Sequence, residues 1–325
     1  MLIDQFGRKA TDLRISVTDR CNYRCVYCMP THVEWLPRPQ ILSFEEIEFL
    51  TRIFAEEGIT EIRLTGGEPL VRRDLHILVS KLNGIPGIKE ISLTTNAYYL
   101  GEQARRLKEA GIQRINISLD TLRPERFYQI TKSDSFERVL QGIDEARRVG
   151  FDPIKINCVA IRGFNDDEIL DFLKWGSENH LQIRFIEFMP LDRDHNWKLA
   201  NVITQSEILA KVKQFTSIDP VTEGEPAPAA KFAYHNSKGE FGVIPSVSEP
   251  FCAHCSRIRL TADGKFRNCL FALEETDLRG PLRAGTGAEK LVGIIRSAVY
   301  RKWAGHKINA PDFQQPQRAM YAIGG

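Results

Sequence analysis

The chain has 325 residues, with 44 Lys and Arg against 42 Asp and Glu, a net charge of +2 and 42% hydrophobic residues. Because nucleic acid and anionic membranes attract a basic excess, this balance argues against either as a partner. No apolar run is long enough to span a bilayer, and the N-terminus lacks the apolar stretch of a signal peptide. We therefore expect a globular, cytoplasmic protein.

Short β-rich segments recur along the first two thirds of the chain, with helical patterns between them. This alternation is typical of βα units around a parallel sheet. Six strands are expected, at residues 13–17, 61–65, 90–94, 114–118, 154–159 and 182–188. Since a complete TIM-type barrel has eight units, the pattern predicts an α/β fold with an incomplete (β/α)6 barrel.

Capping signals mark two of the expected helices. Ser43 with Glu46, and Thr204 with Glu207, have the spacing of a capping box, and the first helix should end before Gly58. A further helix is expected at about residues 288–301.

Residues 223–230, Glu-Gly-Glu-Pro-Ala-Pro-Ala-Ala, break the βα rhythm and predict a linker or surface loop. We therefore divide the chain into a barrel region, 1–222, and a C-terminal region, 223–325. Within the second region, Asp263-Gly264 predicts the turn of a β-hairpin.

Seven cysteines in a chain without an export signal favour metal binding or catalysis over disulfides. Cys21, Cys25 and Cys28 follow the first strand. Three thiolates suit a 4Fe-4S cluster whose fourth iron stays open to chelate a substrate. The alternative is a zinc site completed by His32, although structural zinc sites normally show paired CxxC spacing.

Cys252, Cys255 and Cys269 form a second triad, again with an open fourth position. A zinc knuckle completed by His254 or His235 is the alternative here, and the presence of the first triad favours a second 4Fe-4S cluster. The remaining cysteine, Cys158, is expected to be a core thiol on the fifth strand.

Two arginines, Arg257 and Arg259, follow the second triad and would share one face of a strand. Beside an open cluster they suggest a polyanionic substrate, because arginine binds phosphate bidentately and stays charged. Without the cysteines, a solvated hairpin edge would be the simpler interpretation.

Four more cations lie inside expected strands, where a buried charge is costly unless it is paired. A triphosphate would supply the partner, and Asp or Glu across the barrel is the alternative. These cations are Arg14, Arg63, Lys155 and Arg184.

The first triad, with Tyr27 directly before its third cysteine, resembles the signature of the radical S-adenosylmethionine (radical SAM) enzymes. In that family the open iron binds the amino and carboxylate groups of the methionine moiety. Gly66, Gly67 and Glu68, after the second strand, are similar to the family motif for the amino group, and glycine lets backbone approach a ligand closely. Ser118 and Met189 match family positions that line the cofactor site.

Over its whole length the chain resembles the branch of this superfamily that rearranges GTP in molybdenum cofactor biosynthesis. Shared segments are 13–20, 94–96, 184–189, the second triad with its arginines, and the terminal Gly-Gly. The resemblance implies two 4Fe-4S clusters and cleavage of SAM to methionine and a 5′-deoxyadenosyl radical. That radical would take hydrogen from C3′ of GTP, and C3′ would attack C8 of guanine to give 3′,8-cyclo-7,8-dihydro-GTP. The resemblance implies that six residues contact GTP: Arg14, Arg63, Thr94, Lys155, Arg257 and Arg259. We add Arg184 to this set because it is a further cation inside an expected strand.

Arg257, Arg259, Gly324 and Gly325 are the expected catalytic residues. By the same resemblance, the Gly-Gly tail enters the active site and helps position SAM after GTP binds, whereas a frayed terminus is the alternative. The implied partners are a flavodoxin- or ferredoxin-type electron donor and the downstream cyclic pyranopterin monophosphate synthase. The sequence leaves the oligomeric state, including a homodimer, open.

Two departures from the family stand out: Ala97 replaces a usual glycine, and residues 29–41 form a short segment. Two rival functions remain. A radical SAM enzyme acting on a peptide would usually carry more C-terminal cysteines and lack the paired arginines. A zinc-binding nucleic-acid module is disfavoured by the net charge.

Overall fold

A computed structural model describes the chain except for residues 31, 193, 195–196, 222–227, 236–238 and 325. Its strands are β1 (Asp12–Ser16), β2 (Glu61–Thr65), β3 (Glu90–Thr95), β4 (Arg114–Ser118), β5 (Ile154–Ala160), β6 (Gln182–Glu187), β7 (Ile218–Val221), β8 (Ala230–Tyr234), β9 (Gly239–Ile244), β10 (Arg257–Leu260), β11 (Lys265–Arg267) and β12 (Thr276–Asp277). They form one sheet in the order β12-β11-β10-β1-β2-β3-β4-β5-β6-β9-β8-β7.

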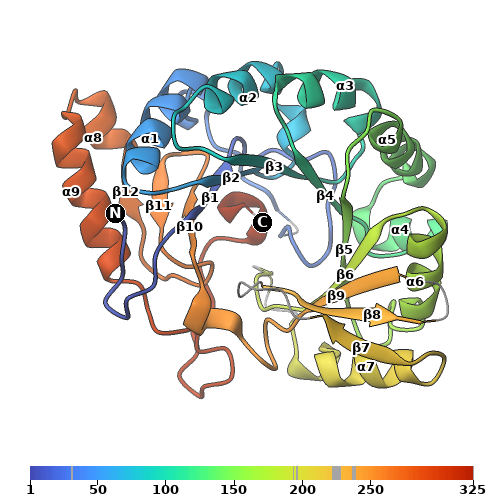
Figure 1. Ribbon diagram of the computed structural model, residues 1–325. Helices are drawn as coiled ribbons and strands as arrows, with labels where there is room; N and C mark the ends of the chain where they lie inside the picture. Colours follow the sequence, from blue (N-terminus) through green and yellow to red (C-terminus); the bar gives the residue numbers. More distant parts are fainter. Residues whose placement is uncertain (31, 193, 195–196, 222–227, 236–238, 325) are drawn as a thin grey trace.

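Most helices cover the outer side of this curved sheet, whereas the short C-terminal helix α10 lies inside the curve (Figure 1). They are α1 (Phe44–Glu56), α2 (Leu75–Asn83), α3 (Leu100–Ala110), α4 (Pro124–Thr131), α5 (Phe136–Arg148), α6 (Ile169–Glu178), α7 (Gln205–Lys213), α8 (Arg279–Arg283), α9 (Ala288–Tyr300) and α10 (Met320–Ile323). Within the described chain, no helix is long and apolar enough to cross a membrane.

The six expected strands are confirmed as β1 to β6, each within one residue of its predicted ends. They pair in parallel and in sequence order, which is the arrangement of an incomplete barrel. Both capping boxes are present, at the starts of α1 and α7. The helix expected near the C-terminus is α9.

The C-terminal region extends the barrel sheet at both edges. Strand β9 pairs in parallel with β6, and β10 pairs in parallel with β1. The predicted hairpin is the antiparallel pair β10 and β11. Most of the predicted linker, residues 223–227 of 223–230, lies outside the described residues. The division at 222/223 therefore stays a prediction, although one sheet runs through both regions.

The two faces of the sheet differ in polarity because side chains alternate along each strand. Leu13, Ile15 and Leu64 belong to the large apolar core that the helices share. The intervening residues, such as Arg14 and Arg63, face the inside of the curve. The barrel interior is thus a polar chamber, and helix α10 lies within it (Figure 1).

Candidate active site

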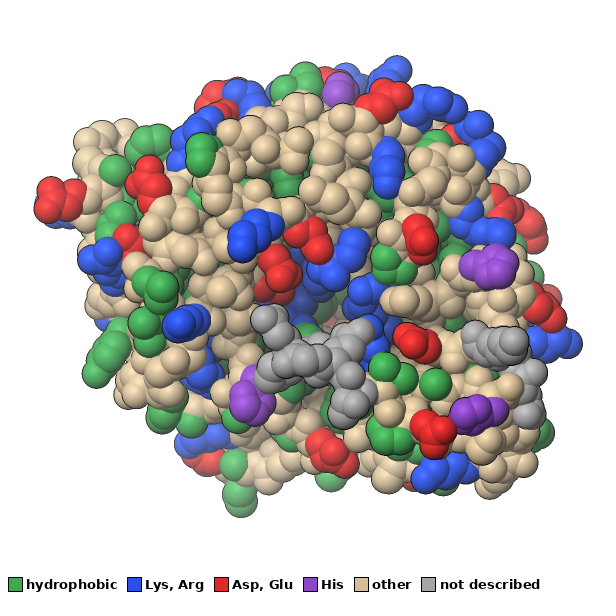
Figure 2. Space-filling view, viewed as in Figure 1, with side chains coloured by type: hydrophobic (Ala, Val, Ile, Leu, Met, Phe, Trp, Pro, Cys, Tyr) green, Lys and Arg blue, Asp and Glu red, His purple; other side chains and the backbone are tan. Residues whose placement is uncertain are grey.

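The expected phosphate-binding cations line the inside of the barrel. Arg14 on β1 lies between Arg259 on β10 and Arg63 on β2, each in register with it. Neighbouring strands are only about 4.8 Å apart, so these like charges repel one another. Figure 2 shows Lys and Arg side chains gathered at a hollow in the middle of this face.

Burial and mutual repulsion lower the pKa of these cations. The pKa of Arg14 and of Arg63 falls to about 10, and that of Arg184 to about 9, mainly through burial and then through neighbouring arginines. Burial, followed by repulsion from Arg184, lowers the pKa of Lys155 to about 7. Lys155 is therefore the cation of this group poised to change charge near neutral pH.

One carboxylate, Asp12, lies among the arginines. Its Oδ2 is 3.7 Å from Arg257 Nε and 4.0 Å from Arg14 Nε. Although burial raises the pKa of Asp12, the surrounding arginines lower it further, so Asp12 is ionised. Arg14 Nε is nevertheless buried without a hydrogen-bond acceptor among the described residues. Asp12 and its register neighbour Glu61, which also interacts with Arg63 and Arg257, cannot balance six cations, so the chamber fits a polyanionic ligand.

The first cysteine triad lies in the loop that follows β1. The loop turns back at Cys25, whose carbonyl accepts hydrogen bonds from the backbone N–H of Cys28 at 2.9 Å and of Met29 at 3.0 Å. Burial raises the pKa of Cys21 and of Cys28 to about 12, and the thiols raise one another's pKa. Three mutually close thiols that resist ionisation fit a metal cluster, because only a bound cation stabilises three thiolates there.

Two carboxylates lie close to this triad. Glu68 is buried and accepts hydrogen bonds from Leu70 N, Thr95 Oγ1 and Asn96 N at 2.6 to 3.0 Å. Burial raises its pKa to about 7. Asp120 accepts a hydrogen bond from Tyr27 Oη at 2.6 Å, and burial raises the pKa of Asp120 to about 6. The first site thus has two buried acidic neighbours, and Arg24, which donates a hydrogen bond to Cys21 O at 2.9 Å, is a cation at its edge.

The glycine pair after β2 is explained by packing of backbone on backbone. A Cβ at Gly66 would lie 2.5 Å from Thr18 O, and one at Gly67 would lie 2.3 Å from Arg20 O. These glycines let the β2 loop press against the segment that leads into the cysteine loop. Their contact with SAM stays a prediction, as do those of Ser118, exposed at the end of β4, and Met189, partly buried after β6.

Nearby, the departure at Ala97 has a structural consequence. Its backbone is left-handed, with φ +63°, a conformation that costs a residue with a side chain about 1 kcal/mol more than glycine. This explains why glycine would suit the position.

The second triad has basic surroundings. Lys302 Nζ donates hydrogen bonds to Cys255 O at 2.8 Å and to Cys255 Sγ at 3.4 Å. Burial raises the pKa of Cys255, but Lys302 and other donors lower it by more, so the net shift is downward. The pKa of Cys252 and of Cys269 is raised, mainly by burial.

The two triads lie at opposite ends of the barrel. The first follows the C-terminal end of β1, whereas Cys252 and Cys255 precede the N-terminal end of the parallel neighbour β10. Five residues of strand separate the two ends by roughly 15 Å. Arg14, Arg257 and Arg259 lie on these strands, so cations occupy the space between the two triads.

The histidines weighed as zinc ligands are all exposed: His32, His254 and His235, of which the last pairs with Asp219 at 2.7 Å. Among the described residues, no three His, Cys, Asp or Glu side chains surround a single metal-ion position. Zinc needs ligands about 2.3 Å or less from one centre, whereas a 4Fe-4S cluster spreads its thiolates over separate irons.

The C-terminal tail enters the chamber. Gly324 O accepts a hydrogen bond from Arg259 Nη1. A Cβ at Gly324 would lie 2.9 Å from Thr65 Cγ2, and its φ of +90° also favours glycine. Tyr321 packs edge-on against Trp35 of the short 29–41 segment, with ring centroids 5.9 Å apart. The tail is thus docked rather than frayed up to Gly324, and Gly325 lies outside the described residues.

Sequence reasoning missed several polar residues of the site. Asn157 faces the chamber beside Ser118 and Arg184 in register, and its buried Oδ1 has no hydrogen-bond partner among the described residues. Period-two spacing from Lys155 could have pointed to it. Asp120 and Lys302 had no local sequence signal. Thr94, by contrast, lies half-buried on the inner face of β3, as its assignment requires.

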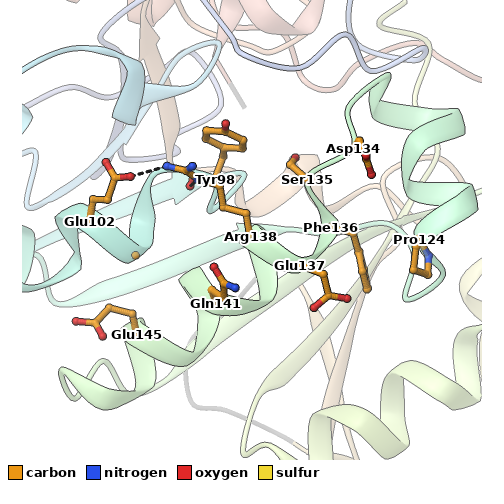
Figure 3. A pocket seen from close by; sticks show the side chains of 11 residues that line it. Tyr98, Glu102, Pro124, Asp134, Ser135, Phe136, Glu137, Arg138, Gln141 and Glu145 are labelled. Atoms are coloured by element: carbon orange, nitrogen blue, oxygen red, sulfur yellow. Dashed lines mark hydrogen bonds and ion pairs between the residues drawn. The ribbon is translucent and has the colours of Figure 1, made fainter.

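A separate pocket lies on the outer side of the barrel, between α3 and α5 (Figure 3). Arg138 lies over the ring of Tyr98 at 4.2 Å and pairs with Glu102. Its lining contains none of the cysteines or inner cations. We therefore assign the chemistry to the chamber and not to this pocket.

The sequence pattern of the radical SAM superfamily matches residues 15–176, and that of Molybdenum Cofactor Synthesis C matches residues 181–308. The chain is 46% identical to a GTP 3′,8-cyclase of Rhodopirellula baltica, over 100% of this chain and 92% of that protein. It is 46% identical to one of Streptomyces coelicolor, over 100% and 96%. It is 44% identical to the mitochondrial one of Arabidopsis thaliana, over 100% and 84%.

Solved structures share the fold at low identity. Streptococcus suis SuiB bound to S-adenosylmethionine matches with a TM-score of 0.64 at 15% identity, over 89% of this chain and 68% of that chain. The anSMEcpe protein with bound AdoMet matches with a TM-score of 0.51 at 19% identity, over 63% and 60%. These matches support the partial barrel.

Proposed function

This chain belongs to the radical SAM superfamily and, within it, to the GTP 3′,8-cyclases, and from that premise we propose how its residues divide the work. The enzyme converts GTP to 3′,8-cyclo-7,8-dihydro-GTP in molybdenum cofactor biosynthesis, with iron-sulfur and SAM cofactors. When bound, these cofactors supply reductive cleavage of SAM to a 5′-deoxyadenosyl radical. The protein supplies binding, orientation and exclusion of water.

The first triad, Cys21, Cys25 and Cys28, would hold the 4Fe-4S cluster that binds SAM. SAM carries a sulfonium and an ammonium group, so the acidic surroundings of this triad suit it. We assign Tyr27, Gly66, Gly67, Glu68, Ser118 and Met189 to its binding site. Asp120 would act on SAM indirectly by fixing the ring of Tyr27.

The second triad, Cys252, Cys255 and Cys269, would hold a further 4Fe-4S cluster whose open iron binds the guanine base. The observation that carries this function is the excess of buried cations on the inner face. Arg14, Arg63, Lys155, Arg184, Arg257 and Arg259 would hold the triphosphate, with Thr94 beside them. A peptide substrate would leave these charges unpaired.

The C-terminal tail would position SAM for productive cleavage once GTP is bound. Gly324 O accepts a hydrogen bond from Arg259, so the tail contacts one of the residues that we assign to GTP. We also propose a flavodoxin- or ferredoxin-type electron donor, delivery of the product to cyclic pyranopterin monophosphate synthase, and a cytoplasmic location where thiols stay reduced. A homodimer is the oligomeric state to test first.

The test uses GTP carrying deuterium at C3′ with the anaerobically reconstituted enzyme and SAM. We expect the label in 5′-deoxyadenosine, detected by mass spectrometry, because hydrogen is abstracted from C3′. GTP labelled at C8 is the control and should transfer none. Absence of label from the C3′ substrate would refute the proposed abstraction site.

A further inference from the structure

Lys302 has an unusual position for a lysine. It lies two residues beyond α9, yet it is only 4% exposed. Its Nζ donates three hydrogen bonds, to Cys255 O at 2.8 Å, to Arg257 O at 2.9 Å and to Cys255 Sγ at 3.4 Å. All three acceptors belong to the segment that carries the second cysteine triad.

The charge of Lys302 needs a partner because burying an unpaired ammonium is costly. No ion pair among the described residues joins Lys302 to a carboxylate, and the two carbonyls solvate the ammonium without neutralising it. The sulfur of Cys255, as a thiolate, does neutralise it. Lys307 is the contrast: it is exposed and pairs with Asp312 at 2.7 Å.

We propose that Lys302 is the charge partner of the second iron-sulfur cluster, holding Cys255 in place and raising the reduction potential of that cluster. The inference rests on the proposed function, in which the second triad binds a 4Fe-4S cluster. Reduction adds one negative charge to a cluster, so a fixed ammonium beside its ligand stabilises the reduced form. Hydrogen bonds to ligand sulfur act in the same direction.

The first triad has a different arrangement. A neighbouring cation, Arg24, donates a hydrogen bond to the carbonyl of Cys21 at 2.9 Å. Among the described residues, Cys21 Sγ accepts hydrogen bonds from Tyr23 N and Asn96 Nδ2. Its acidic neighbours are Glu68 and Asp120, and the described residues place no lysine in hydrogen-bond contact with its sulfurs. The effect of Lys302 should therefore be confined to the second cluster. Lys302 is a positioning residue, since it reaches the substrate only through Cys255.

The test compares Lys302→Met, Lys302→Arg and, as a control, Lys307→Met. Each is made in a parent in which Cys21, Cys25 and Cys28 are serine, so that only the second cluster contributes. The midpoint potential is read from the EPR signal at a series of applied potentials. We expect a more negative potential for Lys302→Met, a potential near the parent's for Lys302→Arg, and no change for Lys307→Met.

The possible failures are distinguishable. A parent that binds no iron would refute the second cluster itself, and with it the proposed function. A parent that binds about four irons, with an unchanged potential in Lys302→Met, would overturn only the role of Lys302. If Lys302→Met cannot hold the cluster, Lys302→Arg decides: retention supports a role of charge, and equal loss overturns it.

Discussion

The two cysteine sites carry the same number of thiols in opposite electrostatic surroundings. At the first site, burial and the neighbouring carboxylates Glu68 and Asp120 raise the thiol pKa values. At the second, burial also raises the pKa of Cys255, but Lys302 and Arg257 together lower it by more. The difference supports the proposed division of ligands: a cationic sulfonium suits the acidic site, and a triphosphate suits the basic one.

The sharpest way to test this division is to remove the thiols. Cys21→Ser should abolish formation of 5′-deoxyadenosine, because the open iron that binds SAM is lost. Cys255→Ser should spare some cleavage but abolish the cyclic product, because GTP is no longer positioned. Chromatography of both products from the same reaction measures the two effects.

Cys158→Ser is the matched control for these variants. Cys158 is buried on β5, where its Sγ donates a hydrogen bond to Asp120 O at 3.6 Å, and it belongs to neither triad. It should keep both activities. Equal loss of SAM cleavage in Cys21→Ser and Cys255→Ser would contradict the proposed division of roles between the two triads.

The apo-protein offers a second test through thiol reactivity, since the thiolate is the species that is alkylated. With a pKa of about 12, Cys21 and Cys28 are ionised in only about one molecule in ten thousand at pH 8. The pKa of Cys255 lies below the ordinary 9.0. Iodoacetamide at pH 8 should therefore label Cys255 at least about a hundredfold faster, as followed by peptide mass spectrometry.

Lys302→Met should slow this labelling of Cys255 and leave Cys21 unchanged. The basic group that favours the Cys255 thiolate is then absent, whereas nothing near Cys21 has changed. Equal rates at both triads in the parent protein would contradict the opposite surroundings described above.

The arginines of the second site provide a third test. Arg257→Ala should weaken GTP binding by roughly 1.5 to 3 kcal/mol, the range for a hydrogen bond to a charged group. Binding of SAM should be nearly unchanged, because Arg257 belongs to the basic site. Calorimetry with each ligand measures both effects.

Arg283→Ala is the control for that variant, because Arg283 is exposed and pairs with Glu46 at 2.6 Å. Guanosine without phosphates should bind poorly even to the unmodified enzyme. Guanosine binding as tightly as GTP would show that the arginines are not a phosphate site.

Much of the fold and of the two cysteine sites could be predicted from the sequence, because these features depend on the spacing of nearby residues. The first triad, the capping boxes and the inner position of Arg14 depend on residues a few positions apart. Lys302 could not be predicted, since it lies 47 positions from Cys255 and meets it only through tertiary packing. The pairing of β9 and β10 with opposite edges of the barrel is likewise decided by which edges remain open.

The glycine pair Gly66 and Gly67 shows that a sequence pattern can be recognised without revealing which contact requires it. Sequence reasoning gave Gly66 and Gly67 a role toward the ligand, whereas the described structure requires them for contact with the backbone of residues 18–20. Both roles leave the same sequence signal. Similarly, the cations in the strands were recognised as costly, but their low pKa values depend on the register that brings them together.

The last prediction concerns Lys155, whose pKa of about 7 leaves it mostly neutral at pH 8 in the free enzyme. The GTP phosphates favour its charged form, so binding at pH 8 should take up close to one proton. Above pH 7, GTP affinity should therefore fall by up to about tenfold per pH unit. Calorimetry in two buffers of different ionisation enthalpy measures the uptake.

Lys155→Arg isolates this effect, because arginine stays charged at every pH used and can still bind phosphate. The variant should bind GTP without taking up a proton at that position. The same shift has a consequence for stability. The unfolded chain holds the proton of Lys155 up to its ordinary pKa of 10.5, so the contribution of Lys155 to the stability of the free protein should increase as pH rises above 7. Proton uptake that is identical in Lys155→Arg would assign the titration to another group, and Lys155 would then already be charged before GTP arrives.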